Sequence, residues 1–299
     1  METDGSSKPS GERAGILAAL FAFGFWGLVP IYFKWVSAAP AVEVIAHRIL
    51  WAIPLLMLFL RRRDGADWWR RLALPRRQIA MLALTGTLVG FNWLIFVYAV
   101  ASDQILATSL GYYINPLVNV LLGVVFLGER LDRLRGAAVL LAGAGVAYLG
   151  WSIHQPPWLA LSLAFTFGFY GLLRKRLAVG PLLGLLWETM LLAPLALTYL
   201  LWAQADGDLA FLHTGRMLDG LLLAAGAVTI LPLIAFNVAA KRLPLSVLGF
   251  FQYLAPTISF LLAVAFYGEP FTRGHQVAFP LIWTALTLVS LRPFLQRRG

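Results

Sequence analysis

Two stretches of this sequence repeat each other and decide the fold: YINPLVNVLLGVVFLGE at residues 113–129 and YLAPTISFLLAVAFYGE at residues 253–269. At an offset of 140, eight of their 17 positions are identical. Leucine and valine matches between two apolar helices arise easily by chance. Tyrosine, proline and Gly-Glu matches in one register do not, and these are Tyr113/Tyr253, Pro116/Pro256 and Glu129/Glu269 with the glycine before each glutamate. The sequence therefore predicts an internal duplication.

The composition places this duplicated chain in a membrane. Residues of the set AVILMFWYC make up 60% of the 299 residues, and charged residues make up 13%, against about 25% charged residues in soluble domains. The mean hydropathy is +0.77. The chain has no cysteine, which excludes thiolate catalysis, disulfides and cysteine-ligated metal centres.

Ten apolar runs approach or exceed the length of about 20 helical residues that a bilayer core of about 30 Å requires. They are residues 14–33, 41–60, 78–100, 105–127, 136–151, 157–173, 181–202, 218–240, 244–267 and 276–291. The first run is longer than the apolar core of a signal peptide, so we interpret it as a retained span. We therefore expect an all-α integral membrane protein with ten transmembrane helices.

The basic residues predict the orientation of these spans. With the N-terminus inside, 20 of the 24 Lys and Arg residues fall on the cytoplasmic side, three fall outside and Arg48 lies within a span. Membrane proteins carry an excess of Lys and Arg in their cytoplasmic loops. Both termini are therefore predicted to be cytoplasmic, and the short basic clusters between apolar runs do not form a nucleic-acid-binding face.

The duplication divides the chain into two five-span halves. We expect a polar, disordered tail at residues 1–12, a first repeat at residues 13–152 and a second at residues 153–299. The segments GFWGL at 24–28 and GFYGL at 168–172 also match, at an offset of 144. Because five is odd, the second half must enter the membrane in the opposite orientation. Inverted repeats build inward-open and outward-open gates around one midplane site, which predicts transport by alternating access.

Several segments resemble one known family. NWLIFVY at 92–98, LGYYINPLVN at 110–119 and GER at 128–130 resemble the drug/metabolite transporter superfamily with EamA-type domains, and its RarD branch in particular. AHRILW at 46–51, LGFFQYLAP at 248–256 and GEP at 268–270 are similar to the same branch. The resemblance covers nearly the whole chain after residue 12. It implies a ten-helix permease of the bacterial inner membrane with two EamA-like repeats, and an association with chloramphenicol sensitivity, but it names no substrate.

Ionisable side chains within spans are costly and are candidates for a role in transport. Glu43 and His47 share one face of the second span, and Arg48 follows them. Arg48 and Glu188 each lie seven residues into their span, about 10 Å from opposite membrane faces. We expect Arg48 or His47 to contact an anionic or polar substrate and Glu188 to couple a proton.

Each of these residues also has a structural interpretation. Arg48 and Glu188 can form an ion pair, because long side chains nearly close the gap of about 10 Å in depth that separates them. His47 can be held by hydrogen bonds in the packed interior, and Glu43 lies near the outer face. Lys34, near the outer mouth, is either a substrate contact or an anchor that extends to the interface.

The fourth span carries a polar stripe. Tyr112, Asn115 and Asn119 recur at spacings of three and four, and Pro116 frees backbone carbonyls nearby. Gln252 and Tyr253 occupy the positions that correspond to Tyr112 and Tyr113. The stripe is either a wall of the substrate site or a set of interhelical hydrogen bonds. The further candidates are Asn92 and Asn237 for binding, and Pro116, Glu129, Pro256 and Glu269 for gating or structure.

Other functions lack their usual residues. There is no HExxH, no GxxxxGK[ST] and no nucleophile elbow, so zinc hydrolysis, internal ATP-driven pumping and serine hydrolysis are not expected. Asp206 and Asp208 are close in sequence, but such loop carboxylates are usually solvated. We expect no catalytic residue, cofactor or metal, and we expect a small-molecule substrate, the lipid bilayer and a coupling proton as partners. A membrane scaffold and a non-transporting membrane enzyme are the alternatives.

Overall fold

The computed structural model describes residues 8–128, 133–152, 154, 157–243, 248 and 251–295 of the chain. Over these residues the chain forms helices joined by short links, without a β-strand. The expectation of an all-α membrane bundle is therefore confirmed.

The helices of the first half are α1 (Lys8–Trp35), α2 (Ala41–Asp64), the short 3-10 helix η1 (Ala66–Leu72), α3 (Arg76–Ala101), α4 (Ile105–Leu127) and α5 (Arg133–Ser152). Those of the second half are α6 (Trp158–Lys175), α7 (Pro181–Asp206), α8 (Arg216–Arg242), α10 (Leu254–Leu261), the π-helical turn η2 (Leu262–Phe266) and α11 (Arg273–Leu295). Proline precedes α2, α3 and α6 and opens α7, where its missing N–H leaves no helical hydrogen bond unmade.

Six described helices are long and apolar enough to cross a bilayer: α1, α2, α3, α4, α7 and α8. Shorter apolar helices cover Gly136–Ser152 in α5 and Leu254–Phe266 in α10 and η2. The protein is therefore a multi-pass membrane protein, and the count of ten spans stays a prediction.

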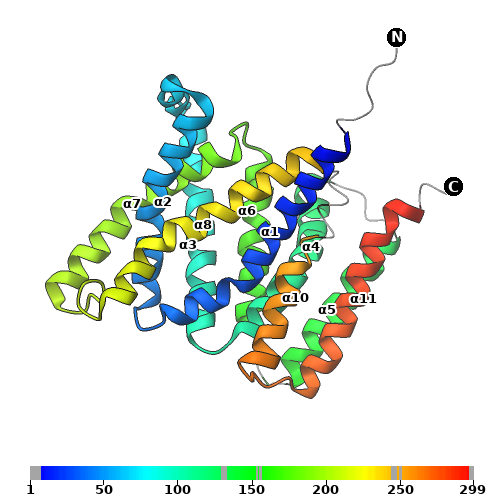
Figure 1. Ribbon diagram of the computed structural model, residues 1–299. Coiled ribbons are helices and arrows are strands. Elements are labelled where there is room, and N and C mark those ends of the chain that lie inside the picture. The colour runs from blue at the N-terminus through cyan, green and yellow to red at the C-terminus, as the bar shows by residue number, and fades with distance from the viewer. Residues whose placement is uncertain are drawn as a thin grey trace, which may run out of the picture.

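The links between helices gather at two ends of the bundle, as Figure 1 shows. One end holds the links that follow α1, α3, α7 and η2, and corresponds to the predicted outer side. The other end holds η1 and the link between α6 and α7, and corresponds to the predicted cytoplasmic side. Backbone N–H groups of the link after α7 donate to Glu43 near the start of α2, and those at the start of α4 donate to Glu269 after η2, so links of the first group lie side by side.

The two halves of the chain interleave. Helix α1 packs on α8 and α10, α2 packs on α7 and α8, and α6 packs on α3 and α4. The pair α5 and α11 forms one edge of the bundle, and α2 and α7 lie at the opposite edge (Figure 1). The faces between α1, α2, α3, α4, α6 and α8 therefore bring residues of both halves into one region.

Glycine permits the closest of these approaches. A Cβ atom added at Gly226 of α8 would collide with the backbone of Trp51 and Ala52 in α2. Gly226 and Thr229 are one turn apart, and so are Arg48 and Trp51. The absent side chain of Gly226 therefore sets the distance between α8 and α2 at the level of Arg48.

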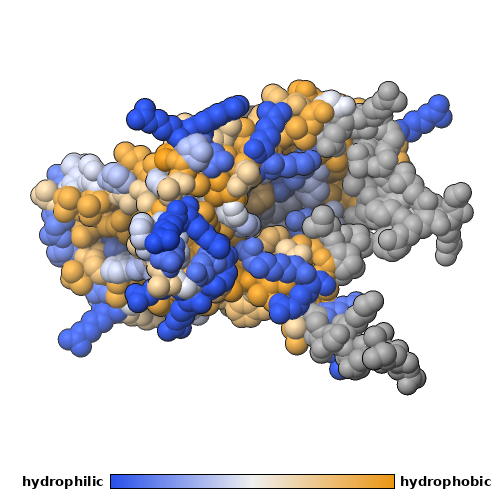
Figure 2. Space-filling view, turned by 90° about the horizontal axis from the view of Figure 1, so that it is seen from above, coloured by the Kyte–Doolittle hydropathy of each residue, from blue (hydrophilic) through white to orange (hydrophobic). Residues whose placement is uncertain are grey.

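The face at the predicted cytoplasmic end is hollowed near its middle. Figure 2 looks onto this end and shows hydrophilic side chains around the hollow, with apolar surface on the flanks of the bundle. Apolar flanks and a hydrophilic end are what a bundle that spans a bilayer requires.

Candidate functional site

Arg48 of α2 contacts three helices, which come from both halves of the chain. Its Nε donates a hydrogen bond to Thr229 Oγ1 of α8 at 2.8 Å. Its guanidinium carbon lies 4.1 Å from the ring centroid of Trp93 in α3 and 5.7 Å from that of Phe33 in α1. We call these four residues, Arg48, Phe33, Trp93 and Thr229, the Arg48 cluster.

The charge of Arg48 has no counter-charge in the described part of the chain. No carboxylate there forms an ion pair with Arg48. Within the described part of the chain, Nε is the one nitrogen of Arg48 that has a hydrogen-bond partner, and the side chain is half-buried. The cluster thus holds a permanent cation whose two terminal nitrogens have no hydrogen-bond partner among the described residues.

His47 and Glu43 form a separate group toward the predicted outer end. The buried Glu43 carboxylate accepts hydrogen bonds from the backbone N–H groups of Ala210 and Phe211 at 3.0 and 2.8 Å. His47 Nδ1 accepts a hydrogen bond from Trp51 Nε1 at 3.0 Å, and its Nε2 lies 4.0 Å from the Glu43 carboxylate. These contacts attach α2 to the link between α7 and α8.

Glu188 is fully buried toward the predicted cytoplasmic end. Its carboxylate accepts hydrogen bonds from Thr85 Oγ1 of α3 at 2.7 Å and from the Tyr170 hydroxyl of α6 at 3.3 Å. Arg174 Nε lies 3.7 Å from the same carboxylate. Gly86 allows this contact, because a Cβ there would lie 3.3 Å from the Glu188 backbone. The partner of Glu188 is therefore Arg174 of its own half, and Arg48 is held elsewhere.

The polar stripe of α4 faces α3 and α6. The Tyr112 ring lies 5.8 Å from Phe96 and 6.3 Å from Phe167. A Cβ at Gly168 would lie 3.5 Å from Asn119 Oδ1, and Asn119 is exposed. Asn115 Oδ1 is buried without a hydrogen-bond partner among the described residues. The stripe thus retains an acceptor and an exposed amide that the described helices do not use.

The second-half counterparts of the stripe lie at a helix break. Gln252 and Tyr253 occupy a turn before α10, whereas the sequence predicts one continuous span over residues 244–267. Pro256 has no N–H to donate to the carbonyl of residue 252, which explains why the helix does not run regularly through this point. Gln252 is exposed, and Tyr253 lines a groove of about 350 Å³ with Leu20, Phe251, Leu254 and Thr257.

Tyr113 and Asn92 are buried and bonded within the bundle. The Tyr113 hydroxyl shares a hydrogen bond of 2.7 Å with Thr257 Oγ1 across α4 and α10. Asn92 Nδ2 donates to the Leu163 carbonyl at 3.0 Å and to Thr166 Oγ1 at 2.8 Å. Both residues thus form hydrogen bonds between helices, and their predicted role in substrate binding stays a prediction. Asn237 bonds only its own helix, at the Leu233 carbonyl.

The remaining predicted residues lie at the predicted outer end. Lys34 pairs with Asp103, and its ammonium lies 5.6 Å from the Tyr267 ring centroid. Glu269 accepts hydrogen bonds from the N–H groups of Ile105 and Leu106, the start of α4, at 2.6 and 2.7 Å. Burial raises the pKa of Glu269, and the two backbone donors oppose that effect.

The last three residues predicted for gating or structure are Pro256, Pro116 and Glu129. The Pro256 carbonyl accepts a hydrogen bond from Ser109 Oγ at 2.7 Å, which joins α10 to α4. Pro116 lies inside α4, between Asn115 and Asn119. Glu129 lies outside the residues that the structure describes.

A series of ring contacts connects the Arg48 cluster to Glu188. Phe33 lies 5.7 Å from Phe96, Phe96 5.8 Å from Tyr112, Tyr112 6.3 Å from Phe167 and Phe167 5.9 Å from Tyr170, between ring centroids. Tyr170 then bonds Glu188. The two charges that the sequence singles out are thus joined through aromatic side chains of α1, α3, α4 and α6.

The sequence did not indicate Trp93, Thr229, Thr85 or Arg174 as site residues. Threonine and tryptophan are common in spans, so their type carries no signal on its own. Arg174 was assigned to the basic cluster that marks the cytoplasmic side. One signal could have indicated Trp93 and Thr229. An arginine within a span that has no acidic partner requires aromatic or hydroxyl neighbours, so such residues on the adjacent spans were candidates.

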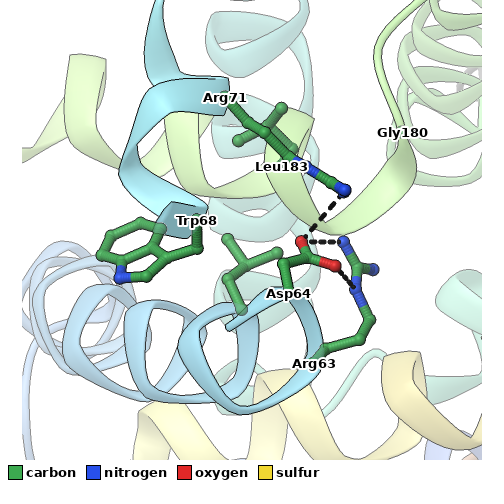
Figure 3. Close-up of a pocket in the computed structure, with 7 residues that line it drawn as sticks. Arg63, Asp64, Trp68, Arg71, Gly180 and Leu183 are labelled. Carbon is green, nitrogen blue, oxygen red and sulfur yellow. Dashed lines mark hydrogen bonds and ion pairs between the residues drawn. The ribbon is translucent and has the colours of Figure 1, made fainter. Parts of the chain in front are cut away.

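A small pocket at the predicted cytoplasmic end is a different feature. Asp64 bonds Arg63 at 2.7 and 2.8 Å, and its carboxylate lies 3.1 Å from Arg71, as Figure 3 shows. The pocket has about 90 Å³, and Leu60, Trp68, Gly180 and Leu183 complete its lining. Small-molecule sites usually hold about 300–1,000 Å³, so we exclude this pocket as the substrate site.

A family comparison accounts for this arrangement. The sequence pattern of the EamA-like transporter family matches residues 13–151 and, a second time, residues 156–291. The chain belongs to the EamA-like transporter family. The EamA-like protein is accordingly a membrane transporter of the bacterial inner membrane, and the family and the names of its relatives indicate a protein that is not an enzyme.

The EamA-like protein has relatives over nearly its whole length. Protein RarD of Escherichia coli K12 is 45% identical over 288 residues, which are 96% of this chain and 97% of the relative. Uncharacterized transporter YojE of Bacillus subtilis is 40% identical, over 93% of this chain and 94% of the relative. Chloramphenicol-sensitive protein RarD of Pseudomonas aeruginosa is 34% identical, over 92% and 93%. One solved structure shares the fold with a TM-score of 0.60 at 20% identity, covering 95% of this chain and 98% of its own.

Proposed function

We propose that this EamA-like protein is a secondary transporter that moves small metabolites or amphipathic drugs across the inner membrane by alternating access. The observation that carries the proposal is Arg48, a cation within a span whose terminal donors have no partner among the described residues. A charge within a span that has no counter-charge is costly, and an anionic or polar substrate that binds there supplies the missing partner. The Arg48 cluster and the α4 stripe form the substrate site in this proposal.

Contacts between the two halves support alternating access. Arg48 of α2 bonds Thr229 of α8, and Glu188 of α7 bonds Thr85 of α3. At the offset of 140, Arg48 and Glu188 are equivalent positions. The division at residues 13–152 and 153–299 therefore places one charge of each sign at equivalent points of two inverted repeats, each hydrogen-bonded to a threonine of the other repeat.

Glu188 is the coupling residue in this proposal. It is fully buried and held by Thr85, Tyr170 and Arg174. Loss or gain of its charge would alter all three contacts, which reach α3 and α6. A proton bound or released there would thus change how α7 packs on α3 and α6.

Reconstituted transport tests the proposal. The purified chain is placed in proteoliposomes, loaded in turn with members of a metabolite and antibiotic panel, and efflux is measured with and without a pH gradient. We expect carrier-dependent efflux that a pH gradient changes, and its loss when Asn115 and Asn119 are both replaced by alanine at equal incorporation. Efflux of no compound would instead favour a membrane scaffold or a non-transporting enzyme.

Chloramphenicol belongs in this panel because of a relative's name. Cells that express the chain should differ from cells with the empty vector in chloramphenicol susceptibility. An equal susceptibility in both would remove chloramphenicol from the proposal and leave the transport function to the rest of the panel.

A further inference from the structure

We infer that the substrate of the Arg48 cluster is an organic monoanion with a flat ring, whose anionic group binds the free guanidinium nitrogens and whose ring packs on aromatic side chains. This inference rests on the proposed transport function, and it narrows the substrate to one chemical class.

The charge follows from the state of Arg48. Arginine stays protonated in proteins and presents its donors in a planar fork that fits a carboxylate. Here only Nε is used, by the Thr229 hydroxyl. The Thr229 hydroxyl in turn donates to the Ala225 carbonyl at 2.9 Å, so its oxygen is left as an acceptor for Arg48. The fork itself remains open for an anion.

The single charge follows from the surroundings. Glu43 is bonded to two backbone N–H groups, Glu188 is paired with Arg174, and Glu269 is bonded to the start of α4. No buried carboxylate in the described residues is left to bind an ammonium, which disfavours a zwitterion. Lys34, the neighbouring cation, is paired with Asp103. A second negative charge would therefore find no unpaired cation beside Arg48 among the described residues.

The flat ring follows from the side chains beside Arg48. Phe33 contacts both the guanidinium and Phe96, and Phe96 contacts Tyr112. Aromatic pairs at centroid distances of about 4.5–7 Å stabilise each other beyond their area of contact. The guanidinium of Arg48 already lies over the Trp93 ring, 4.1 Å from its centroid, so this face of Trp93 is occupied. Phe33 and Phe96 are buried, so the half-buried Tyr112 is the ring of this series that a ligand ring would meet.

Ligands that differ in one property test this inference on the unmodified protein. The full chain, purified in detergent at pH 7.5, is titrated by calorimetry with benzoate, benzamide, cyclohexanecarboxylate, phthalate and phenylalanine. We expect benzoate to bind about ten- to hundredfold more tightly than neutral benzamide, because a charge-assisted hydrogen bond is replaced by a neutral one. We also expect it to bind more tightly than each of the other three.

Two substitutions locate the site. Arg48→Gln should weaken benzoate binding at least about tenfold, and Arg48→Lys should retain part of it, because lysine keeps the charge and loses the fork. Arg216→Gln is the matched control: it removes an exposed arginine at the start of α8 and should leave benzoate binding unchanged. If Arg48→Gln does not fold, the ligand series and Arg48→Lys still decide the question.

The outcomes separate this inference from the proposed function. Three results would overturn the claim that an anionic group binds Arg48. They are equal binding of benzoate and benzamide, undetectable binding of benzoate, and wild-type benzoate binding by Arg48→Gln. Equal binding of cyclohexanecarboxylate would overturn the flat ring, and equal binding of phthalate or phenylalanine would overturn the single charge. Efflux of a neutral or cationic compound would keep the transporter and reject this substrate class. Efflux of nothing, with selective benzoate binding, would reject the transporter and keep the anion site.

Discussion

Arg48 and Glu188 occupy equivalent positions of the two predicted repeats and yet have different surroundings. Arg48 stacks on Trp93 and bonds a hydroxyl. Glu188 is closed in by a cation, a phenol and a hydroxyl. The two charges do not pair with each other. Arg174, which is closer to Glu188 in the sequence, forms the ion pair with Glu188 instead. Glu188 thus has a counter-charge, whereas Arg48 has none among the described residues.

Removal of the Glu188 charge tests its role in coupling. Glu188→Gln keeps the shape and a hydrogen-bond acceptor for Thr85 but has no proton to exchange. We expect efflux by this variant to lose its dependence on the pH gradient, while substrate exchange without a gradient continues. Proteoliposome efflux at two internal pH values measures both, and Glu12→Gln, an exposed glutamate of α1, serves as the control. An unchanged pH dependence would contradict coupling through Glu188.

At the residue scale, the sequence predicted which charges are within spans but not what they contact. Arg48, His47, Glu43 and Glu188 were found because ionisable residues stand out in apolar runs. Their partners are threonines, aromatic rings and backbone N–H groups, which are frequent everywhere in the chain. Only the packing of helices from the two halves determines which of these groups contact the charged residues.

At the scale of elements, α8 lies against α2 without a side chain between them at Gly226. Gly226→Ala should lower the free energy of unfolding by about 1–3 kcal/mol, because a methyl group would push against backbone atoms that cannot move aside. Thermal unfolding of the purified protein measures this as a lower midpoint. We also expect weaker substrate binding, since α8 carries Thr229.

The control for this substitution is another helical glycine. Gly24 of α1 has no neighbouring atom within 4 Å of an added Cβ. Gly24→Ala should leave the midpoint unchanged or raise it, because alanine favours the helix by about 0.5–1 kcal/mol. A midpoint for Gly226→Ala equal to that of Gly24→Ala would show that α8 moves away from α2 without cost.

Helix positions were predictable from the sequence, and the ninth span shows the limit. Its apolar run predicted one helix over residues 244–267, but the described part holds a turn at Gln252 and Tyr253, the helix α10 and a π-helical turn. Hydropathy reports only that a segment is apolar. It does not report where a proline or an extra residue per turn interrupts the hydrogen-bond pattern.

At the scale of the whole molecule, the absence of cysteine makes the predicted orientation directly measurable. Asp67 lies in η1 at the predicted cytoplasmic end, and Thr214 lies before α8 at the predicted outer end; both are exposed. In intact cells, an impermeant maleimide should label Thr214→Cys and not Asp67→Cys. After the membrane is opened, both should react. Labelling of Asp67→Cys in intact cells would reverse the orientation.

The overall fold was the most predictable level, because it depends on properties of many residues together. The duplicated motif, the lengths of the apolar runs and the distribution of Lys and Arg all indicated the same bundle. The interleaving of the halves was not predictable, because hydropathy and repeats do not specify which helix faces which. The contacts of α2 with α8, and of α7 with α3, appear only in the structure.

The two threonine contacts have a consequence for how such a protein is built and inherited. Each half carries a charge within the membrane whose hydroxyl partner is encoded by the other half. Neither half on its own supplies this hydroxyl partner, so each half depends on the other to complete the contacts of its charged residue. A substitution at Thr85 or Thr229 therefore acts first on a charged residue that the other half of the chain carries.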